Sequence, residues 1–196
     1  MATHAERRAV TRGAVLRSAN ELFSGQGFAA TTIDDIAAAA GVAKGAVYHH
    51  FSTKEVLFEA VFDDTSRAVA QRLAKAAPAE PVDILKRLAA GARAYFAACA
   101  EPATFRIILK DGPLVLGWAR WREIDMRDFG HFVPRALKAA MKQGLIAKQP
   151  VEPLARLIVG AITEAAMACA ESDNPARTGK QHVSALETLL EGLRLR

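Results

Sequence analysis

The sequence predicts an all-α protein of about nine helices, in which an N-terminal three-helix unit precedes a larger C-terminal helical domain. Apolar residues recur at helical spacing along most of the 196-residue chain. No stretch after Pro81 shows the two-residue alternation of a strand. Residues 31–51 contain a helix, a glycine turn and a second helix in close succession. With 51% hydrophobic residues, the chain can bury a substantial core.

The first predicted helix covers residues 8–24. One of its faces carries an apolar stripe, and the glycine-containing segment at 25–28 ends it. We expect this helix to support the next two, with Phe28 filling the space beneath them. Arg7, Arg8 and Arg12 lie before or at its start. They form either a solvated terminus or an arm that binds phosphates or a minor groove.

The second predicted helix begins at Thr32. The Thr32 hydroxyl can accept a hydrogen bond from the backbone N–H of Asp35, and Asp34 and Asp35 suit the positive end of a helix. Gly41 ends this helix, because glycine readily adopts the left-handed conformation. A third helix of about two turns is expected over residues 44–50. This arrangement is a helix-turn-helix, whose second helix enters the DNA major groove.

The outer face of this third helix carries residue types suited to nucleic acid. Lys44 can reach a phosphate or a guanine edge. Tyr48 and His49 can donate hydrogen bonds to phosphates or bases. Gly45 and Ala46 are small, so the backbone can approach DNA closely. The third helix is therefore a candidate recognition helix.

A fourth helix is predicted from Thr53 to about residue 77, without glycine or proline and roughly 35 Å long. Lys54, in its first turn, sits where its ammonium group could hold a phosphate. The PAEP segment at residues 78–81 ends the helix and marks a plausible domain boundary. A rod of this length could transmit motion between the two parts of the chain.

Beyond residue 81 we expect further helices joined by short connections. They cover residues 85–101, 104–110, 118–141 with a break near Gly130 and Pro134, 153–170 and 181–195, and residues 111–117 are expected to form a loop.

Residues 11–62, and above all TTIDDIAAAAGVAKGAVYHHFSTKEVLFEAVF, resemble the DNA-binding domain of the tetracycline-repressor (TetR) family. The match is gapless and covers about a quarter of the chain. It implies a transcriptional regulator, most simply a repressor, that binds a palindromic operator as a homodimer and is released by a small apolar or aromatic effector. It also implies a helix-turn-helix domain at 1–55 and an effector-binding and dimerisation domain at 56–196. The implied DNA contacts, with Tyr48 and Lys54 on phosphates, are Thr32, Lys44, Gly45, Ala46, Tyr48, His49 and Lys54.

One position departs from the family pattern. Many members carry an arginine where this chain has Asp34, and that arginine often reads a base. An aspartate could accept a hydrogen bond from a cytosine amine, and otherwise it repels phosphate. The sequence leaves open whether Asp34 replaces that contact or removes it.

Large apolar side chains are dense in the C-terminal part. They are either ordinary core or, as the family's variable domain suggests, include the lining of an apolar effector pocket. Glu164 interrupts an apolar helix, so it either places a polar group in that pocket, pairs with a cation or lies at an interface. The predicted pocket residues are Phe96, Phe105, Leu109, Trp118, Trp121, Phe129 and Glu164.

The last two helices each carry an apolar stripe, of which one could serve the core and the other a partner. The family packs these helices against their symmetry mates as a four-helix dimer interface. A recognition helix of two turns contacts few base pairs, so DNA binding also favours a dimer. The predicted interface residues are Leu157, Gly160, Ala161, Leu186, Leu190 and Leu193.

Composition and motifs limit the other function classes. The net charge of +5 permits a polyanionic partner without establishing one. No GxSxG, HExxH, paired-carboxylate or glycine-rich phosphate motif is present, so an enzyme is disfavoured and no cofactor or metal site is expected. Cys99 and Cys169 are expected to be buried thiols in a cytoplasmic protein with neither a signal peptide nor a membrane-spanning run. The main alternative is a DNA-binding structural protein without an effector.

Overall fold

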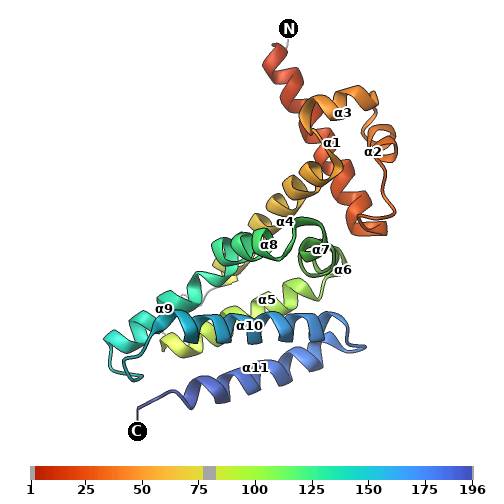
Figure 1. Cartoon of the computed structure of the whole chain (residues 1–196). Coiled ribbons are helices and arrows are strands. Elements are labelled where there is room, and N and C mark those ends of the chain that lie inside the picture. Colours follow the sequence, from red (N-terminus) through yellow and green to blue (C-terminus); the bar gives the residue numbers. More distant parts are fainter. Residues whose placement is uncertain (1–2, 77–82, 196) are drawn as a thin grey trace.

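The computed structural model describes residues 3–76 and 83–195, and Figure 1 shows a small head joined to a longer helical body. The head contains α1 (His4–Gln26), α2 (Ile33–Ala40) and α3 (Lys44–His50). The long helix α4 (Lys54–Ala76) runs from the head into the body. The PAEP boundary predicted at residues 78–81 lies outside the described residues.

The body is built from helices alone. Its elements are α5 (Ile84–Cys99), α6 (Pro102–Phe105), the π-helix η1 (Arg106–Asp111), α7 (Gly112–Leu116), α8 (Trp118–Asp125), the π-helix η2 (Met126–Gly130), α9 (Phe132–Lys142), α10 (Val151–Ala170) and α11 (Pro175–Glu191). The predicted all-α class is confirmed, because the described residues form no strand and only one isolated bridge, between Ile146 and Arg194. Helices α5, α10 and α11 lie side by side across the lower body (Figure 1) and pack on one another.

Local capping sets the bounds of α2 as the sequence predicts. The Thr32 hydroxyl accepts from the backbone N–H of Asp35 at 3.1 Å, and the Asp35 carboxylate accepts from the N–H of Thr32 at 3.0 Å. The Thr32 hydroxyl also donates to the Asp35 carboxylate at 2.6 Å, and this bond, together with the one from the Thr32 N–H, lowers the pKa of Asp35. At the other end, Gly41 has a left-handed φ of 67°. The turn into α3 therefore follows from residues adjacent in the sequence.

The first helix is longer than predicted. It begins at His4, because Thr3 and Glu6 form a capping box there. Arg7 and Arg8 consequently lie in the first turns of α1, so the chain is helical there and any contact of these arginines with phosphates stays a prediction. Arg12 lies over the ring of Phe51, with its guanidinium carbon 5.1 Å from the ring centroid.

Phe28 packs beneath the helix-turn-helix as expected. Its ring lies 5.7 Å from the Phe23 ring and 5.3 Å from the Phe58 ring, measured between centroids. Phe23 and Phe58 are fully buried, so α1, α4 and the α1–α2 loop share one aromatic cluster. This cluster fixes the head on the first turns of α4.

Two predictions in the body are wrong. Residues 112–116 form α7 rather than a loop, because Gly112 lets α4, α7 and α8 approach closely: a Cβ there would lie 2.6 Å from the Phe62 ring. The last helix starts at Pro175 instead of residue 181. The Asn174 side chain caps it by accepting from the N–H of Arg177 at 3.0 Å, and proline suits a first turn.

Helix α10 is long and apolar enough to cross a membrane by length and composition alone, although Arg156 and Glu164 interrupt its apolar run. In the structure it packs against α5, α9 and α11. A core helix of a helical body meets the same compositional criterion. Cys99 and Cys169 are free and buried, as predicted, and burial raises the pKa of Cys99 to about 12.

Candidate nucleic-acid interface and ligand cavity

Helix α3 presents a polar face to solvent. Val47 is fully buried and anchors the helix, while Lys44, Gly45, Tyr48 and His49 are exposed. Ala46 is half-buried. A Cβ added at Gly45 would meet no atom within 4 Å, so another backbone could approach there. Thr32, at the start of α2, is also exposed.

Lys44 is not isolated on this surface. Its ammonium nitrogen lies 2.9 Å from an Asp34 carboxylate oxygen, and this hydrogen bond raises the pKa of Lys44. Both side chains are exposed, so solvent screening keeps such a pair weak. The position at which the family often has arginine therefore holds a carboxylate that pairs with Lys44.

Lys54 has partners inside the head. Its ammonium group donates to the backbone carbonyls of Phe28 and Thr31, both at 2.9 Å, and lies 4.1 Å from the centroid of the Phe28 ring. The side chain is half-buried. The sequence predicted an ammonium group available to a phosphate, whereas the structure uses it to hold the loop before α2.

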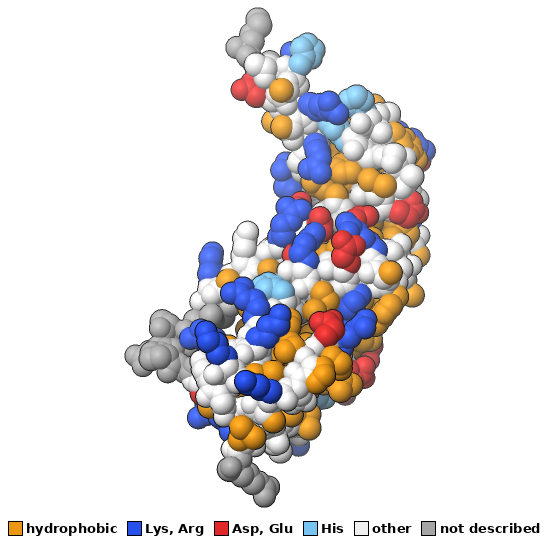
Figure 2. Space-filling model, turned by 60° about the vertical axis from the view of Figure 1, so that its left-hand side comes forward, with side chains coloured by type: hydrophobic (Ala, Val, Ile, Leu, Met, Phe, Trp, Pro, Cys, Tyr) orange, Lys and Arg blue, Asp and Glu red, His pale blue; other side chains and the backbone are white. Residues whose placement is uncertain are grey.

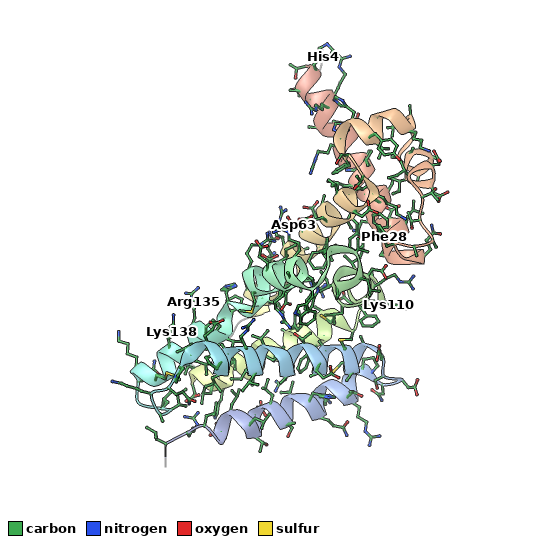
Figure 3. The ribbon with its side chains drawn as sticks, viewed as in Figure 1. His4, Phe28, Asp63, Lys110, Arg135 and Lys138 are labelled. Carbon is green, nitrogen blue, oxygen red and sulfur yellow. The ribbon has the colours of Figure 1, made fainter. Side chains whose placement is uncertain are left out.

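The same loop is bound to the body. Asp111, at the end of η1, accepts from the backbone N–H of Phe28 at 2.8 Å. Phe28 thus lies where head and body meet (Figure 3). A π-helix places Asp111 there, and such elements often occur at functional positions. Short-range sequence patterns carry no signal for this contact, because the two residues are far apart in the chain.

The body contains a partly open cavity of about 450 Å³. Its walls come from the end of α4, from α5, from the α8–η2 segment, and from α9 and α10. This volume lies within the usual range of small-molecule sites. The lining is mainly apolar and rich in alanine, with Tyr95, Phe129 and Phe132 as its aromatic members.

The predicted pocket residues are divided between different places. Phe129 lines the cavity. Phe96 is buried in the core and lines neither this cavity nor the open groove beside it, so its assignment to the pocket is wrong. The remaining predicted residues line this groove, which has a volume of about 840 Å³ and is hardly more open to solvent than the cavity. They are Phe105, Leu109, Trp118, Trp121 and Glu164.

The polar groups of the cavity are few. Asp125 is 2% exposed, and one of its oxygens lies 3.0 Å from an Arg122 nitrogen. Burial raises the pKa of Asp125 to about 6, although Arg122 acts in the opposite direction. Thr163 donates its hydroxyl to the Val159 carbonyl at 2.9 Å. Asp125 was not predicted to line a pocket, because the helices that bury it are distant in the sequence.

The predicted dimer stripes are also divided. Leu186 and Leu190 are 6% and 2% exposed and pack within the protomer, so their assignment to a partner surface is wrong. Leu193 is half-buried against the same core. On the outer faces, Leu157 of α10 is 72% exposed and Leu189 of α11 is 64% exposed. Leu189 was not predicted because the apolar stripe of the last helix marks the side that faces the core. That stripe consists of Val183, Leu186, Leu190 and Leu193.

Charge is unevenly spread over the surface. Figure 2 shows Lys and Arg side chains gathered along the concave edge between the head and the body. This basic character, an exposed α3 and a helical body with a cavity define the class: a DNA-binding helix-turn-helix regulator with a separate helical domain.

Comparison with known proteins identifies the family. The model described as "Tetracyclin repressor-like, C-terminal domain" matches residues 85–193, and "Bacterial regulatory proteins, tetR family" matches residues 15–61. The first match alone exceeds half the chain, so the protein belongs to the tetracycline-repressor (TetR) family. Members of this family are transcriptional regulators rather than enzymes.

Individual relatives agree with this assignment. A TetR-family transcriptional regulator from Pectobacterium atrosepticum is 33% identical, with a TM-score of 0.80, over 100% of this chain and 99% of that one. A solved chain from Shewanella sp. PV-4 is 25% identical, with a TM-score of 0.71, over 95% and 99%. A helix-turn-helix transcriptional repressor of Mycobacterium tuberculosis is 41% identical over 70 residues, which are 36% of this chain and 37% of the repressor. The alignment thus spans little more than a third of that curated relative.

Proposed function

We propose that this protein is a one-component transcriptional repressor of the cytoplasm that binds a palindromic operator as a homodimer and is released by a small apolar or aromatic effector. The observation that carries this proposal is the exposed polar face of α3, held on a completely buried helix-turn-helix core. The proposed DNA-facing residues are Thr32, Lys44, Gly45, Ala46, Tyr48 and His49. Lys54 contributes by fixing the loop that presents Thr32.

The head of residues 1–55 and the body of residues 56–196 are proposed as the two functional domains, with α4 shared between them. A seven-residue recognition helix reads only a few base pairs, so two copies are needed for a specific site. In a dimer the two copies of α3 must be about 34–36 Å apart to enter successive major grooves on one face of DNA. A change of a few ångströms in this spacing removes contacts on one side.

The proposed dimer face combines the outer sides of α10 and α11. Leu157 and Leu189 supply exposed apolar surface, and Ala161 beside them is small and exposed. A Cβ at Gly160 would meet nothing within 4 Å in the protomer, so the space above it is available to a partner helix. Four helices packed around a two-fold axis would bury this surface.

The α8–η2 segment connects the cavity to the rod α4. It contributes Asp125 and Phe129 to the cavity wall. On its other side Asp128 accepts from the Ser66 hydroxyl at 2.6 Å, and Arg127 pairs with Asp63 at 3.0 Å. A ligand that moves this segment therefore acts on α4. The position of Asp63 on the upper part of α4 is seen in Figure 3.

The loop contact of Asp111 gives the body a second connection to the head. Movement of α4 relative to η1 would strain the hydrogen bond to the Phe28 N–H. The effector need only bind the released arrangement more tightly than the DNA-bound one. A coupling of about 1–3 kcal/mol gives a 5- to 150-fold loss of DNA affinity.

Selection of a binding site from a random duplex pool, followed by fluorescence anisotropy, tests the proposal. We expect enrichment of a palindrome bound by two protomers, with weaker binding when Tyr48 and His49 are both replaced by alanine. Equal affinity for the selected and random duplexes would contradict specific recognition. If DNA binding is specific but no cavity ligand alters it, the protein is instead a DNA-binding protein without an effector.

A further inference from the structure

One buried hydroxyl group has no partner. Tyr95 of α5 is 4% exposed, and its Oη atom finds no hydrogen-bond partner among residues 3–76 and 83–195. Buried tyrosine hydroxyls are normally hydrogen-bonded, because leaving one unpaired is unfavourable. Tyr95 also lines the cavity. An unpaired donor at a cavity wall is a feature that a ligand can satisfy.

The Asp125 carboxylate, at the end of α8, is a charged group that acts on the Tyr95 hydroxyl. Burial first, and then Cys99 and Asp125, raise the pKa of Tyr95 well above its usual value, so the hydroxyl keeps its proton. Asp125 lines the same cavity and is almost fully buried. The Tyr95 hydroxyl in turn lowers the pKa of Asp125, so the two groups face each other, but they form no hydrogen bond of ordinary geometry.

Asp125 is held in place from behind. Arg122 pairs with one carboxylate oxygen at 3.0 Å, and its guanidinium carbon lies 4.8 Å from the ring centroids of both Trp118 and Trp121. Trp121 is itself fixed by its indole N–H, which donates to the Ile108 carbonyl at 2.8 Å. The carboxylate is therefore a preorganised acceptor whose charge already has a counter-ion.

The rest of the wall favours an apolar ring. The Phe129 ring lies 5.1 Å from the Tyr95 ring between centroids, and Phe132 also lines the cavity. Thr163 is already bonded to a backbone carbonyl. Arg87 and Arg135 line the cavity but are exposed, and Figure 3 places Arg135 on the outer side of the body along α9. The polar pair of Tyr95 and Asp125 is accordingly surrounded by aromatic and aliphatic surface.

We propose that the effector is a small aromatic hydroxyl compound whose O–H group binds between Tyr95 and Asp125. This inference rests on the proposed role of the cavity as the effector site. The ligand oxygen accepts from the Tyr95 hydroxyl and its proton is donated to the Asp125 carboxylate, so both groups are satisfied at once. The ring packs against Phe129.

Other polar groups fit this pair less well. An ether or ketone accepts from Tyr95 but offers Asp125 no proton. A carboxylate meets the like charge of Asp125. An ammonium group offers Tyr95 no acceptor and competes with Arg122 for the carboxylate. A hydroxyl group is both donor and acceptor at one uncharged atom, which is what this pair requires.

Calorimetric titration of the full-length protein with 2-naphthol, 2-methoxynaphthalene and 2-naphthoate tests the inference. We expect 2-naphthol to bind at least about tenfold more tightly than the other two. Tyr95→Phe keeps the ring and removes only the hydroxyl that donates to the ligand oxygen, so it should weaken 2-naphthol and 2-methoxynaphthalene alike, by about 2- to 12-fold. The chain has two tyrosines, and Tyr48→Phe on the head provides a matched control that should keep both affinities.

Three results would overturn the inference: no binding of 2-naphthol, equal binding of the three compounds, or an unchanged affinity for 2-naphthol in Tyr95→Phe. These titrations use no DNA, so they are separate from the proposed repressor function. Anisotropy with a selected operator and saturating 2-naphthol then tests release. A Tyr95-dependent ligand that leaves DNA affinity unchanged would support the hydroxyl site and contradict the effector-release mechanism.

Discussion

Replacing Leu157 by glutamate should dissociate the dimer and leave the protomer folded. Leu157 lies on the outer face of α10 and keeps 72% of its surface exposed in the protomer. Full burial of a leucine side chain contributes about 1.5–3 kcal/mol, so burying the exposed part in a dimer should contribute about 1–2 kcal/mol per copy. An interface with two-fold symmetry contains two copies, which gives about 2–4 kcal/mol.

Loss of this contribution weakens the dimer roughly 30- to 1000-fold. An unpaired carboxylate in an apolar interface weakens it further. Sedimentation equilibrium gives the dimer dissociation constant, and circular dichroism gives the melting temperature of the same samples. Leu189→Glu, on the outer face of α11, should behave in the same way.

Leu186→Glu is the matched control. Its leucine is 6% exposed and packs inside the protomer, so the variant should lose its fold rather than merely its partner. Gly160→Leu tests the same face in a second way. The protomer has space at that position, so the added side chain should obstruct only a partner helix and weaken the dimer. Unchanged dimer dissociation constants for Leu157→Glu, Leu189→Glu and Gly160→Leu, with intact folding, would place the interface elsewhere.

Three other changes test the head and the cavity. Lys54→Ala should lower the stability of the head by about 2–4 kcal/mol, since two charge-assisted hydrogen bonds are lost; thermal unfolding measures this, and a salt dependence of DNA binding flatter by about one unit with unchanged stability would restore a phosphate role. Asp34→Ala should raise affinity for random duplex in anisotropy titrations, because it frees Lys44 and removes a carboxylate; no gain would show that this pair does not face DNA. For Asp125→Asn, the folded-state pKa of about 6 lies above the ordinary 3.8, so the charge destabilises the fold above pH 6 and this cost disappears as the pH falls toward 4. Denaturant unfolding at pH 7 and 4 should therefore show the wild type gaining about 2 kcal/mol relative to the variant, and a constant difference would contradict the raised pKa.

The head could be predicted in detail because its signals lie close together in the chain. Thr32 and Asp35 form a capping pair three residues apart, and Gly41 ends the same short helix. Such bonds depend on local geometry and little on the rest of the fold. The family resemblance rests on the same stretch of sequence.

The partners of Lys54 and Asp111 could not be predicted in this way. Lys54 donates to carbonyls 26 and 23 residues away, and Asp111 accepts from an N–H 83 residues away. Neither separation repeats a helical or turn spacing. An exposed cation suited to a phosphate and a cation holding a loop look the same in sequence.

The cavity and the partner face show the same limit. The pocket prediction relied mainly on aromatic side chains, yet much of the cavity wall is alanine, and Phe96 belongs to the core. An apolar stripe shows that one face of a helix is buried, but it does not say whether the protomer or a partner covers it. Leu186 and Leu190 are covered by the protomer.

Footprinting of the protein on its selected operator tests the central claim most directly. The account predicts protection with two-fold symmetry, half-site centres about 34–36 Å apart, and loss of that protection when a cavity ligand is added. A one-sided footprint from a single protomer, or protection that a bound cavity ligand leaves unchanged, would contradict it.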